Sequence, residues 1–274
     1  MPVTVRTYAS TEEAARALAS SRSARFFGGG TLLMRGCNDG DQSVDTLIRA
    51  SDPALKQIRA EGDRIVIGAH VTMREVLASR DLAFLAPVAR VVGGPAIRTM
   101  ATVGGNLFAP SPYGDFTVAL LAVDGTVQTV GNVGSGRAMP LEHFLRDRDR
   151  EPRALVTSVS VLRPRDAGAL RFAKVSRIKP KGVSVMSIAA LLPMSGGRVS
   201  QARIAYGAMA ATPIRVPAVE RALEGKMLDA QGIAAALAVA TERLDPPTDS
   251  LASAWYRREV APVHLKRLLL GAAS

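Results

Sequence analysis

The stretch TVGGNLFAPSPYGDF, residues 102–116, holds three glycines, two prolines and an asparagine, and it contains a single acid, Asp115. Glycine at this density marks backbone that must adopt conformations, or approach neighbouring groups, in ways that side chains would prevent. A run of backbone N–H groups without side-chain bulk also forms a concave donor surface that suits phosphate oxygens. The stretch therefore predicts either a structural turn or a phosphate-binding loop.

A second glycine-rich segment, FFGGGTLLM at residues 26–34, follows a short strand-like run. One such loop is more typical of a structural turn. Two of them in a region of mixed α and β character favour a ligand held at several points, such as the pyrophosphate of a dinucleotide. Neither segment has the P-loop pattern or the GxGxxG pattern with a later acid. A dinucleotide would therefore bind outside the P-loop and Rossmann patterns.

The composition indicates a soluble globular protein. The 274 residues are 47% hydrophobic and 22% charged, as in ordinary globular domains. No apolar run is long enough to cross a membrane, and the polar start MPVTVRTYASTEE lacks the apolar core of a secretory signal. We therefore expect a cytoplasmic protein. Cys37 is the only cysteine, which excludes an internal disulfide, a cysteine-based zinc site and an iron–sulfur cluster held by this chain alone.

The charge balance suggests an anionic partner or ligand. Lys and Arg number 35 against 24 Asp and Glu, a formal net charge of +11. The basic residues are spread along the whole chain, aromatic residues make up only 4%, and no nucleic-acid-binding motif occurs. We therefore expect no nucleic-acid binding. The charge is better explained by solvated faces and a subunit interface.

The first part of the chain reads as alternating strands and helices. Ser10 and Glu13, and again Thr72 and Glu75, have capping-box spacing at the start of a helix. Asp124 and the following glycine mark a turn between two apolar runs. Strands are expected at residues 3–9, 24–27, 46–50 and 64–70, and an apolar helix is expected from residue 82 before the second glycine loop.

The second part reads as a meander of strands followed by helices. Residues 163–168 are expected to form a linker, and the SGGR segment at 195–198 a hairpin turn. We expect Pro262 to end or kink the last helix. Strands are predicted at 170–176, 183–194 and 199–209, and helices at 216–227, 230–244 and 254–272.

Together, FFGGGTLLM and PAIRTMATVGGNLFAPSPYGDF resemble the FAD-binding medium subunit of the molybdenum hydroxylases, the xanthine dehydrogenase and carbon monoxide dehydrogenase family. The resemblance extends over essentially the whole chain, since RIAYGAMAATPIRVPAVERALEGKML is similar to the C-terminal domain of that family. It implies that the two glycine loops hold the flavin pyrophosphate and that an S-P-x-x-D stretch follows. The implied FAD-binding residues are Gly28, Gly29, Gly30, Thr31, Leu32, Thr102, Gly104, Gly105, Asn106, Asp115 and Lys174.

The resemblance also implies the fold. It is an α+β protein with a vanillyl-alcohol-oxidase (PCMH)-type FAD-binding module of two α/β subdomains, followed by a C-terminal three-stranded antiparallel sheet with a helical bundle. The FAD-binding domain would cover residues 1–165, with subdomains of about 1–55 and 56–165, and the C-terminal domain residues 169–274. The strand and helix pattern read from the sequence agrees with this architecture.

The function implied by the resemblance is electron transfer inside a larger enzyme. A molybdopterin-binding large subunit would hydroxylate the substrate, a small subunit with two [2Fe-2S] clusters would carry the electrons, and FAD in this chain would pass them to NAD, oxygen or a quinone. The assembly implied is a dimer of heterotrimers, a heterohexamer. No catalytic acid or base and no metal site is expected in this chain. The alternative is a self-contained FAD reductase of the same superfamily, similar to UDP-N-acetyl-enolpyruvylglucosamine reductase.

Simpler roles stay open for several residues. Asp115 could be the N-cap of the apolar segment that follows it, Asn106 could only stabilise its turn, and Lys174 could face solvent. His70, His143 and His264 stand apart from one another and from acid clusters, which argues against a metal site. The segment SRIKPKGVSV departs from the resemblance, because Gly182 stands where many members have an aspartate.

Overall fold

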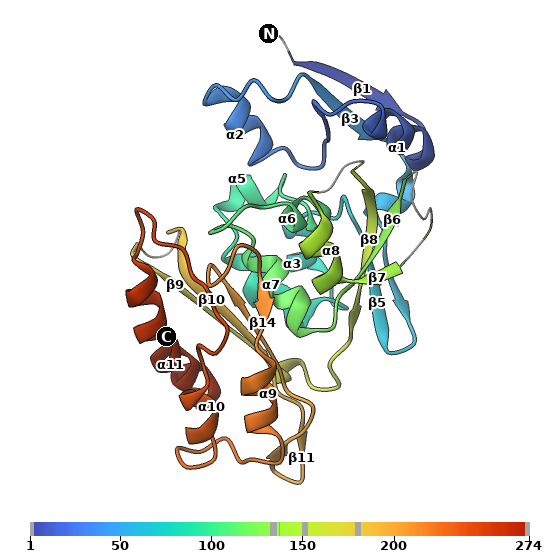
Figure 1. Cartoon of the computed structure of the whole chain (residues 1–274). Coiled ribbons are helices and arrows are strands. Elements are labelled where there is room, and N and C mark those ends of the chain that lie inside the picture. Colours follow the sequence, from blue (N-terminus) through green and yellow to red (C-terminus); the bar gives the residue numbers. More distant parts are fainter. Residues whose placement is uncertain (1–2, 132–135, 137, 150–152, 179–181, 272–274) are drawn as a thin grey trace. The chain divides into compact units, whose positions relative to one another are not determined.

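The computed structural model describes residues 3–131, 136, 138–149, 153–178 and 182–271, and its chain divides into two compact units that are not contiguous in sequence. The first unit comprises residues 1–81, 93–109 and 125–162, and the second comprises 82–92, 110–124 and 163–274. Figure 1 shows the labelled helices and strands of both.

The first unit begins with a three-stranded parallel sheet. Strands β1 (Thr4–Tyr8) and β2 (Ala24–Phe26) each pair in parallel with the central strand β3 (Thr46–Ala50). Helix α1 (Thr11–Ala19) connects β1 to β2, as the parallel pairing of strands requires a crossover. Its N-cap Ser10 accepts the N–H of Glu13, so the helix starts where the spacing of these two residues predicted. The short helix α2 (Leu33–Asn38) follows β2.

The rest of the first unit is a five-stranded antiparallel sheet with short helices. The strand order is β4 (Ile58–Glu61), β5 (Arg64–Gly68), β8 (Leu155–Leu162), β6 (Thr126–Val130) and β7 (Ala138–Pro140). The helical elements are η1 (Pro53–Lys56), α3 (Met73–Ala78), α5 (Pro95–Arg98), α6 (Val103–Leu107) and α8 (Leu141–Asp147). The predicted capping box of α3 is present, with Thr72 and Glu75 bonded reciprocally.

The second unit is built on a four-stranded antiparallel sheet. Its order is β14 (Ile214–Arg215), β13 (Arg203–Gly207), β10 (Ser184–Leu191) and β9 (Leu170–Ser176). Three of these strands are the predicted meander, and the two-residue β14 is an addition at the edge. The predicted turn at residues 195–198 is the hairpin of β11 (Met194–Ser195) and β12 (Arg198–Val199), in which Gly196 and Gly197 have positive φ.

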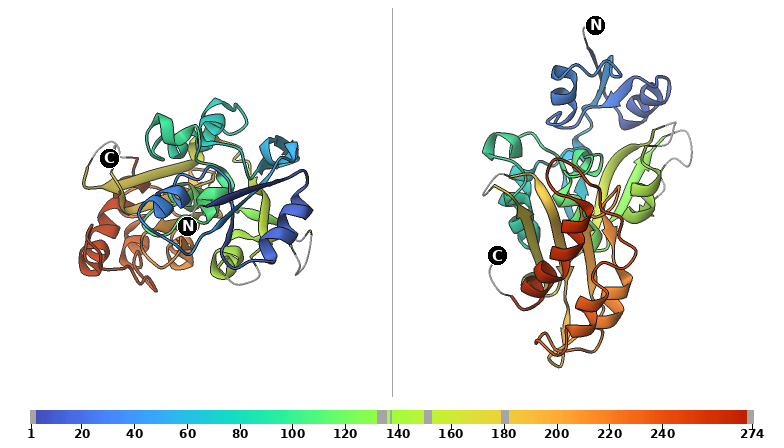
Figure 2. Two further views of the ribbon diagram at one scale, coloured as in Figure 1. Left: turned by 90° about the horizontal axis from the view of Figure 1, so that it is seen from above. Right: turned by 60° about the vertical axis from the view of Figure 1, so that its left-hand side comes forward.

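Helices cover one face of this sheet. Apolar residues of β10 and β13 share one buried cluster with α9 (Pro217–Leu223), α10 (Ala234–Ala238) and α11 (Ala254–Leu269). Figures 1 and 2 show these orange and red helices beside the yellow strands. Helix α10 is shorter than predicted. Of the two outcomes expected for Pro262, an end or a kink of the last helix, the end does not occur, because α11 continues to Leu269.

Helix α7 (Asp115–Ala122) belongs to the same unit and is buried at all eight positions. The apolar run before the turn at Asp124 is therefore helical, and Asp124 itself has φ of 56°. A helix that is apolar all round is typical of a protein interior. The remaining helical elements of this unit are η2 (Ala83–Leu85), α4 (Ala86–Arg90) and η3 (Ala167–Ala169).

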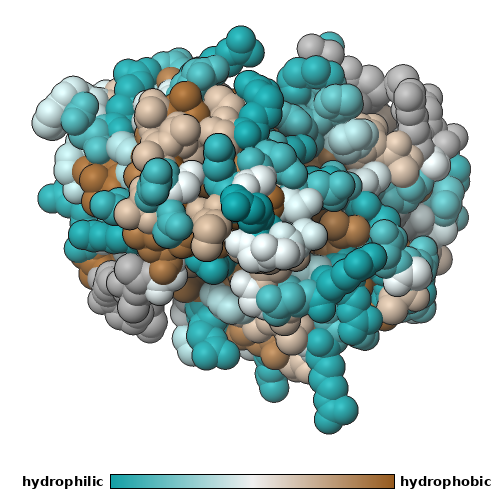
Figure 3. Space-filling view, turned by 90° about the horizontal axis from the view of Figure 1, so that it is seen from below, coloured by the Kyte–Doolittle hydropathy of each residue, from teal (hydrophilic) through white to brown (hydrophobic). Residues whose placement is uncertain are grey.

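The surface of the described residues carries both hydrophobic and hydrophilic areas. On the face drawn in Figure 3, hydrophobic residues form separate brown areas between hydrophilic ones. None of the helices in the described ranges combines the length and hydrophobicity needed to cross a membrane.

Candidate functional site

The first glycine loop presents five backbone N–H groups in succession. Strand β2 ends at Phe26, and the N–H of the next residue, Phe27, still donates to the carbonyl of Ile48 at 2.7 Å before the loop begins. The N–H groups of residues 28–32 donate no hydrogen bond to any residue that the structure describes. Helix α2 then begins at Leu33, and Gly30 makes the turn with φ of 68°, a value that favours glycine. Consecutive N–H groups of this kind form an anion-binding surface.

The two glycine loops lie against each other within the first unit. A Cβ added to Gly28 would approach Thr102 Oγ1 to 2.7 Å, and one added to Gly29 would overlap the carbonyl oxygen of Met100. A Cβ on Gly104 would approach the Cβ of Ala69 to 2.7 Å. The absence of side chains at these three positions is therefore explained by packing of protein against protein.

The second loop has its N–H groups already bonded. The N–H of Val103 donates to the carbonyl of Val71 at 2.9 Å, and that of Gly104 donates to the carbonyl of Ala69 at 2.8 Å. The other two donate to the N-cap residue Thr102: Gly105 N–H to Oγ1 at 3.1 Å, and Asn106 N–H to the carbonyl at 3.0 Å. We expected free donors on both loops from the sequence. In this structure the first loop has N–H groups that donate to no described residue, whereas the N–H groups of residues 103–106 in the second loop are bonded.

The second loop instead offers a bare surface. Gly105 is exposed, and an added Cβ would meet only Thr102 Oγ1, at 2.9 Å. Asn106 is half-buried beside it. A ligand can therefore approach the backbone at Gly105 in a way that it cannot at Gly104, which is buried against Ala69.

Asp115 and Lys174 form a buried ion pair within the second unit. Lys174 Nζ lies 2.8 Å from Asp115 Oδ2, and the two side chains are only 13% and 8% exposed. Lys174 also donates to the carbonyl of Val91 at 3.2 Å, and Ser184 Oγ donates to Asp115 Oδ1 at 2.7 Å. The structure thus brings together two residues that are 59 positions apart in the sequence.

The simpler alternatives for this pair are wrong. The N-cap of α7 is Gly114, with φ of 98°, and Asp115 is the first helical residue, with no side-chain capping bond. Its carboxylate is used for Ser184 and Lys174 instead. Lys174 is not a solvent-facing strand lysine, because it is bonded in the interior.

The departure at Gly182 has a steric reason. The N–H of Gly182 donates to the carbonyl of Ile178 at 2.8 Å, and an added Cβ would overlap that oxygen. An aspartate could therefore not occupy this position without a change of backbone. Lys179 and Lys181, the two lysines of the segment SRIKPKGVSV, lie outside the described residues.

Two residues near these sites carried no sequence signal. Ser184 sits in the apolar run of β10 and is 1% exposed. His70 stacks on Phe26, with ring centroids 5.3 Å apart, and burial together with the positive charges of Lys56 and Arg49 lowers its pKa to about 4. In the described part of the chain, no three His, Cys, Asp or Glu side chains gather as metal ligands.

Comparison with known proteins identifies the family to which the chain belongs. Residues 2–164 match the family of the FAD binding domain in molybdopterin dehydrogenase, and residues 171–272 match the CO dehydrogenase flavoprotein C-terminal domain. The chain belongs to the FAD-binding subunits of the molybdenum hydroxylase family. It is thus a subunit of an oxidoreductase, and FAD is its cofactor.

Individual relatives agree with this family. The chain is 28% identical to the carbon monoxide dehydrogenase medium chain of Afipia carboxidovorans, over 78% of this chain and 76% of that one. It is 30% identical to the 6-hydroxypseudooxynicotine dehydrogenase complex subunit alpha of Paenarthrobacter nicotinovorans, over 79% and 75%. The carbon monoxide dehydrogenase of Hydrogenophaga pseudoflava matches the fold with a TM-score of 0.90 at 26% identity, covering 98% of this chain and 96% of that one. The predicted fold is confirmed.

Proposed function

We propose that this chain is the electron-transfer subunit of a molybdenum hydroxylase complex. It would accept electrons from [2Fe-2S] clusters of a small subunit and deliver them through FAD to NAD, oxygen or a quinone. Substrate oxidation would occur on a molybdopterin-binding large subunit. Support comes from the relatives, which are described as medium chains or as subunits of a complex, and from the single cysteine, which cannot hold a cluster.

The proposal depends mainly on the row of N–H groups at residues 28–32, which donate to none of the residues that the structure describes. A pyrophosphate bears two negative charges and several acceptor oxygens, and such donors match it without any side chain. Thr31 can add its hydroxyl. The donor set of the first loop therefore fits FAD.

The other predicted residues take supporting parts in the proposal. Gly105 gives the cofactor access to the backbone, and Asn106 supplies an amide. Thr102 and Gly104 hold the second loop in place through Gly105 and Ala69. Leu32, half-buried at the end of the donor row, completes the set of the first loop.

Asp115 and Lys174 are proposed to contact the flavin together. Lys174 uses two of its three N–H groups, on Asp115 and Val91, so one remains within the described structure. Asp115 keeps further acceptor capacity after its bonds to Lys174 and Ser184. Because the two charges neutralise each other, the pair can direct hydrogen bonds at the ribityl chain or the ring edge without a large net field.

When bound, FAD supplies the redox chemistry, and the residues of this chain bind and orient it. No acid or base of this chain is needed. The domain boundary near residues 165–169, the dimer of heterotrimers and the cytoplasmic location belong to the same proposal. The domain boundary is supported by the match of separate families to residues 2–164 and 171–272.

Thr31 provides the test. Thr31→Asp places a carboxylate among the five donors, where it competes with the pyrophosphate, whereas Thr31→Asn has nearly the same size and no charge. We expect the aspartate variant to bind FAD at least about tenfold more weakly than the asparagine variant. Titration of the full chain with FAD, followed by flavin fluorescence, measures both. Equal affinities would reject the first loop as the pyrophosphate site.

A further inference from the structure

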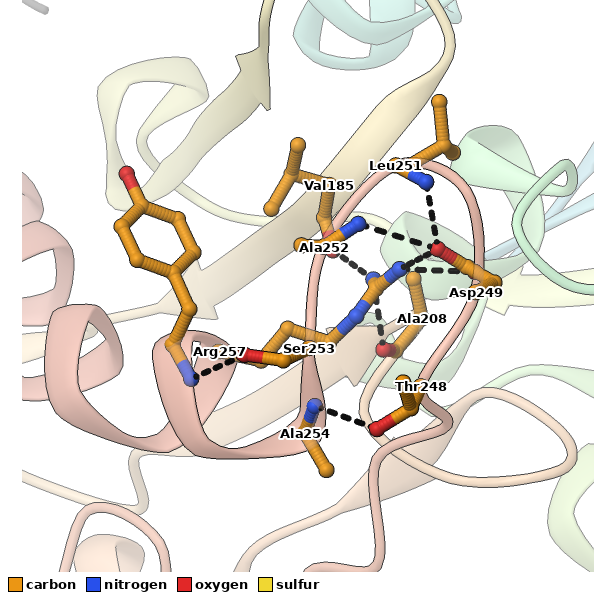
Figure 4. Close-up of polar contacts among 10 residues, drawn as sticks. Val185, Ala208, Thr248, Asp249, Leu251, Ala252, Ser253, Ala254 and Arg257 are labelled. Atoms are coloured by element: carbon orange, nitrogen blue, oxygen red, sulfur yellow. Dashed lines mark hydrogen bonds and ion pairs between the residues drawn. The ribbon is translucent and has the colours of Figure 1, made fainter.

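Arg257 is a fully buried charge in helix α11. Its side chain is 0% exposed and is the largest of the fully buried side chains described. Both carboxylate oxygens of Asp249 lie 2.8 Å from its Nη2. This charge-assisted contact of one nitrogen with both oxygens offsets part of the cost of burying the guanidinium. Figure 4 shows the guanidinium between Asp249 and two backbone carbonyls, those of Val185 and Ala208.

The Asp249 side chain is itself held in place. Its Oδ1 accepts the N–H groups of Leu251 at 2.9 Å and Ala252 at 3.1 Å. The loop then leads directly into α11, whose N-cap Ser253 accepts the N–H of Tyr256. The carboxylate that orients Arg257 is therefore itself held by two backbone N–H groups of its own loop.

Val185, one acceptor of Arg257, lies at an irregularity of strand β10. The pairing with β9 shifts between Ser184 and Met186, so Val185 has no partner residue in β9. A bulge of this kind interrupts the ladder and re-aims neighbouring side chains. Nη1 of Arg257 donates to the Val185 carbonyl, and it also donates to that of Ala208, at 3.2 Å. Arg257 thus donates to the carbonyl of a residue that has no partner residue in β9.

The bulge is adjacent to the ion pair. Ser184, the residue before Val185, donates to Asp115 Oδ1 at 2.7 Å, and Asp115 holds Lys174. A continuous chain of bonds therefore runs from Asp249 through Arg257, Val185 and Ser184 to Asp115. Each link lies within the second unit.

We propose that Arg257 is a positioning residue for the cofactor site: by fixing the bulge at Val185 it sets Ser184, and through Ser184 it sets the direction in which Asp115 and Lys174 face the flavin. This inference rests on the proposed role of Asp115 and Lys174. A purely structural Arg257 would contribute to stability and leave the environment of a bound flavin unchanged. The C-terminal helix, far from Asp115 in sequence, would instead tune that environment.

The test compares three variants of the full chain. Arg257→Lys keeps a positive charge but cannot bond Asp249 and two carbonyls together. Ser184→Ala removes the link to Asp115 and keeps Arg257. Arg258→Lys is the control, because Arg258 is an exposed neighbour on the same helix and bonds Leu244 and Asp245, neither of which belongs to the chain of bonds that leads to Asp115.

We expect Arg257→Lys and Ser184→Ala each to change the visible circular dichroism of bound FAD and to raise its dissociation constant about threefold to thirtyfold. The double variant should show no more than the larger of the two effects, because both act through one path. Arg258→Lys should match the wild type. If the single effects add in the double variant, or if Arg257→Lys leaves the dichroism unchanged, the inference fails.

Two further results distinguish failure of this inference from misfolding of a variant and from failure of the proposed function. If Arg257→Lys does not fold, Asp249→Asn replaces it, since it removes the charge that orients the guanidinium; an unchanged flavin spectrum there would overturn the inference. If the wild-type chain binds no FAD, the proposed function and this inference both fail. Binding that responds to Thr31→Asp but not to Arg257 rejects this inference alone.

Discussion

Lys174 Nζ lies 2.8 Å from Asp115 Oδ2, and neither side chain is more than 13% exposed. Replacing one partner leaves the other charge buried without its counter-ion, which typically destabilises a protein by about 3–5 kcal/mol. We therefore expect Asp115→Asn and Lys174→Met each to lower the free energy of unfolding by about this amount, and the double variant to be more stable than either. Urea denaturation without FAD measures all three.

The matched control for this prediction is an exposed pair. Arg59 and Glu61 lie 3.3 Å apart with side chains 51% and 57% exposed. Arg59→Gln should change the free energy of unfolding by no more than about 1 kcal/mol, since exposed pairs contribute little. A double variant as unstable as the sum of the two single variants would show that Asp115 and Lys174 are not coupled.

The glycines of the two loops should fall into two classes. Gly29→Ala brings a methyl group onto the Met100 carbonyl, and we expect a loss of about 2–4 kcal/mol because backbone must move. Gly105→Ala meets only a hydroxyl in the first turn of α6, so its cost should stay below about 1 kcal/mol. Thermal unfolding of the two alanine variants separates packing glycines from the exposed one.

Gly105→Val extends this comparison to the cofactor. The larger side chain blocks the exposed backbone that we assign to FAD, so affinity for FAD should fall by about tenfold or more, beyond what any loss of stability explains. Flavin fluorescence titration at a temperature where the variant is fully folded gives the result. Affinity equal to that of Gly105→Ala would show that the cofactor does not approach at this position.

The sequence was sufficient to locate the two glycine loops and several of the helices and strands. Apolar periodicity and capping residues such as Ser10 and Thr72 are local features, and the structure has the helices that they predicted. Local sequence could not show why residues 28 and 29 must be glycine. The reason is that Thr102 and the Met100 carbonyl occupy the space that a side chain would need. That reason depends on a contact between segments about seventy residues apart, and such contacts leave no pattern in either segment alone.

The same limit applies to the ion pair and to Arg257. Asp115 and Lys174 were both singled out from the sequence, but their bond to each other requires the pairing of α7 with the β9–β10 sheet. Ser184 lies in an apolar strand, and Arg257 lies beside the exposed Arg258 in a run of charged residues. Sequence reasoning treats such an arginine as solvated, and only the tertiary structure shows that it is buried.

His70 gives a prediction for the dependence of stability on pH. Burial, aided by Lys56 and Arg49, lowers its pKa from 6.5 to about 4. Above pH 6.5 the residue is neutral in both the folded and the unfolded chain, and its packing on Phe26 is unaffected. As the pH falls from 6.5 towards 4, the unfolded chain binds a proton that the folded chain does not, so folding becomes less favourable by up to about 3 kcal/mol.

Replacing His70 by Leu should remove this part of the pH dependence, whereas His143→Gln, at an exposed position of α8, should retain it. Urea denaturation of the three proteins at several pH values between 4 and 7 measures the slopes, and a His70→Leu slope equal to that of the wild type would mean that folding does not lower the pKa of His70.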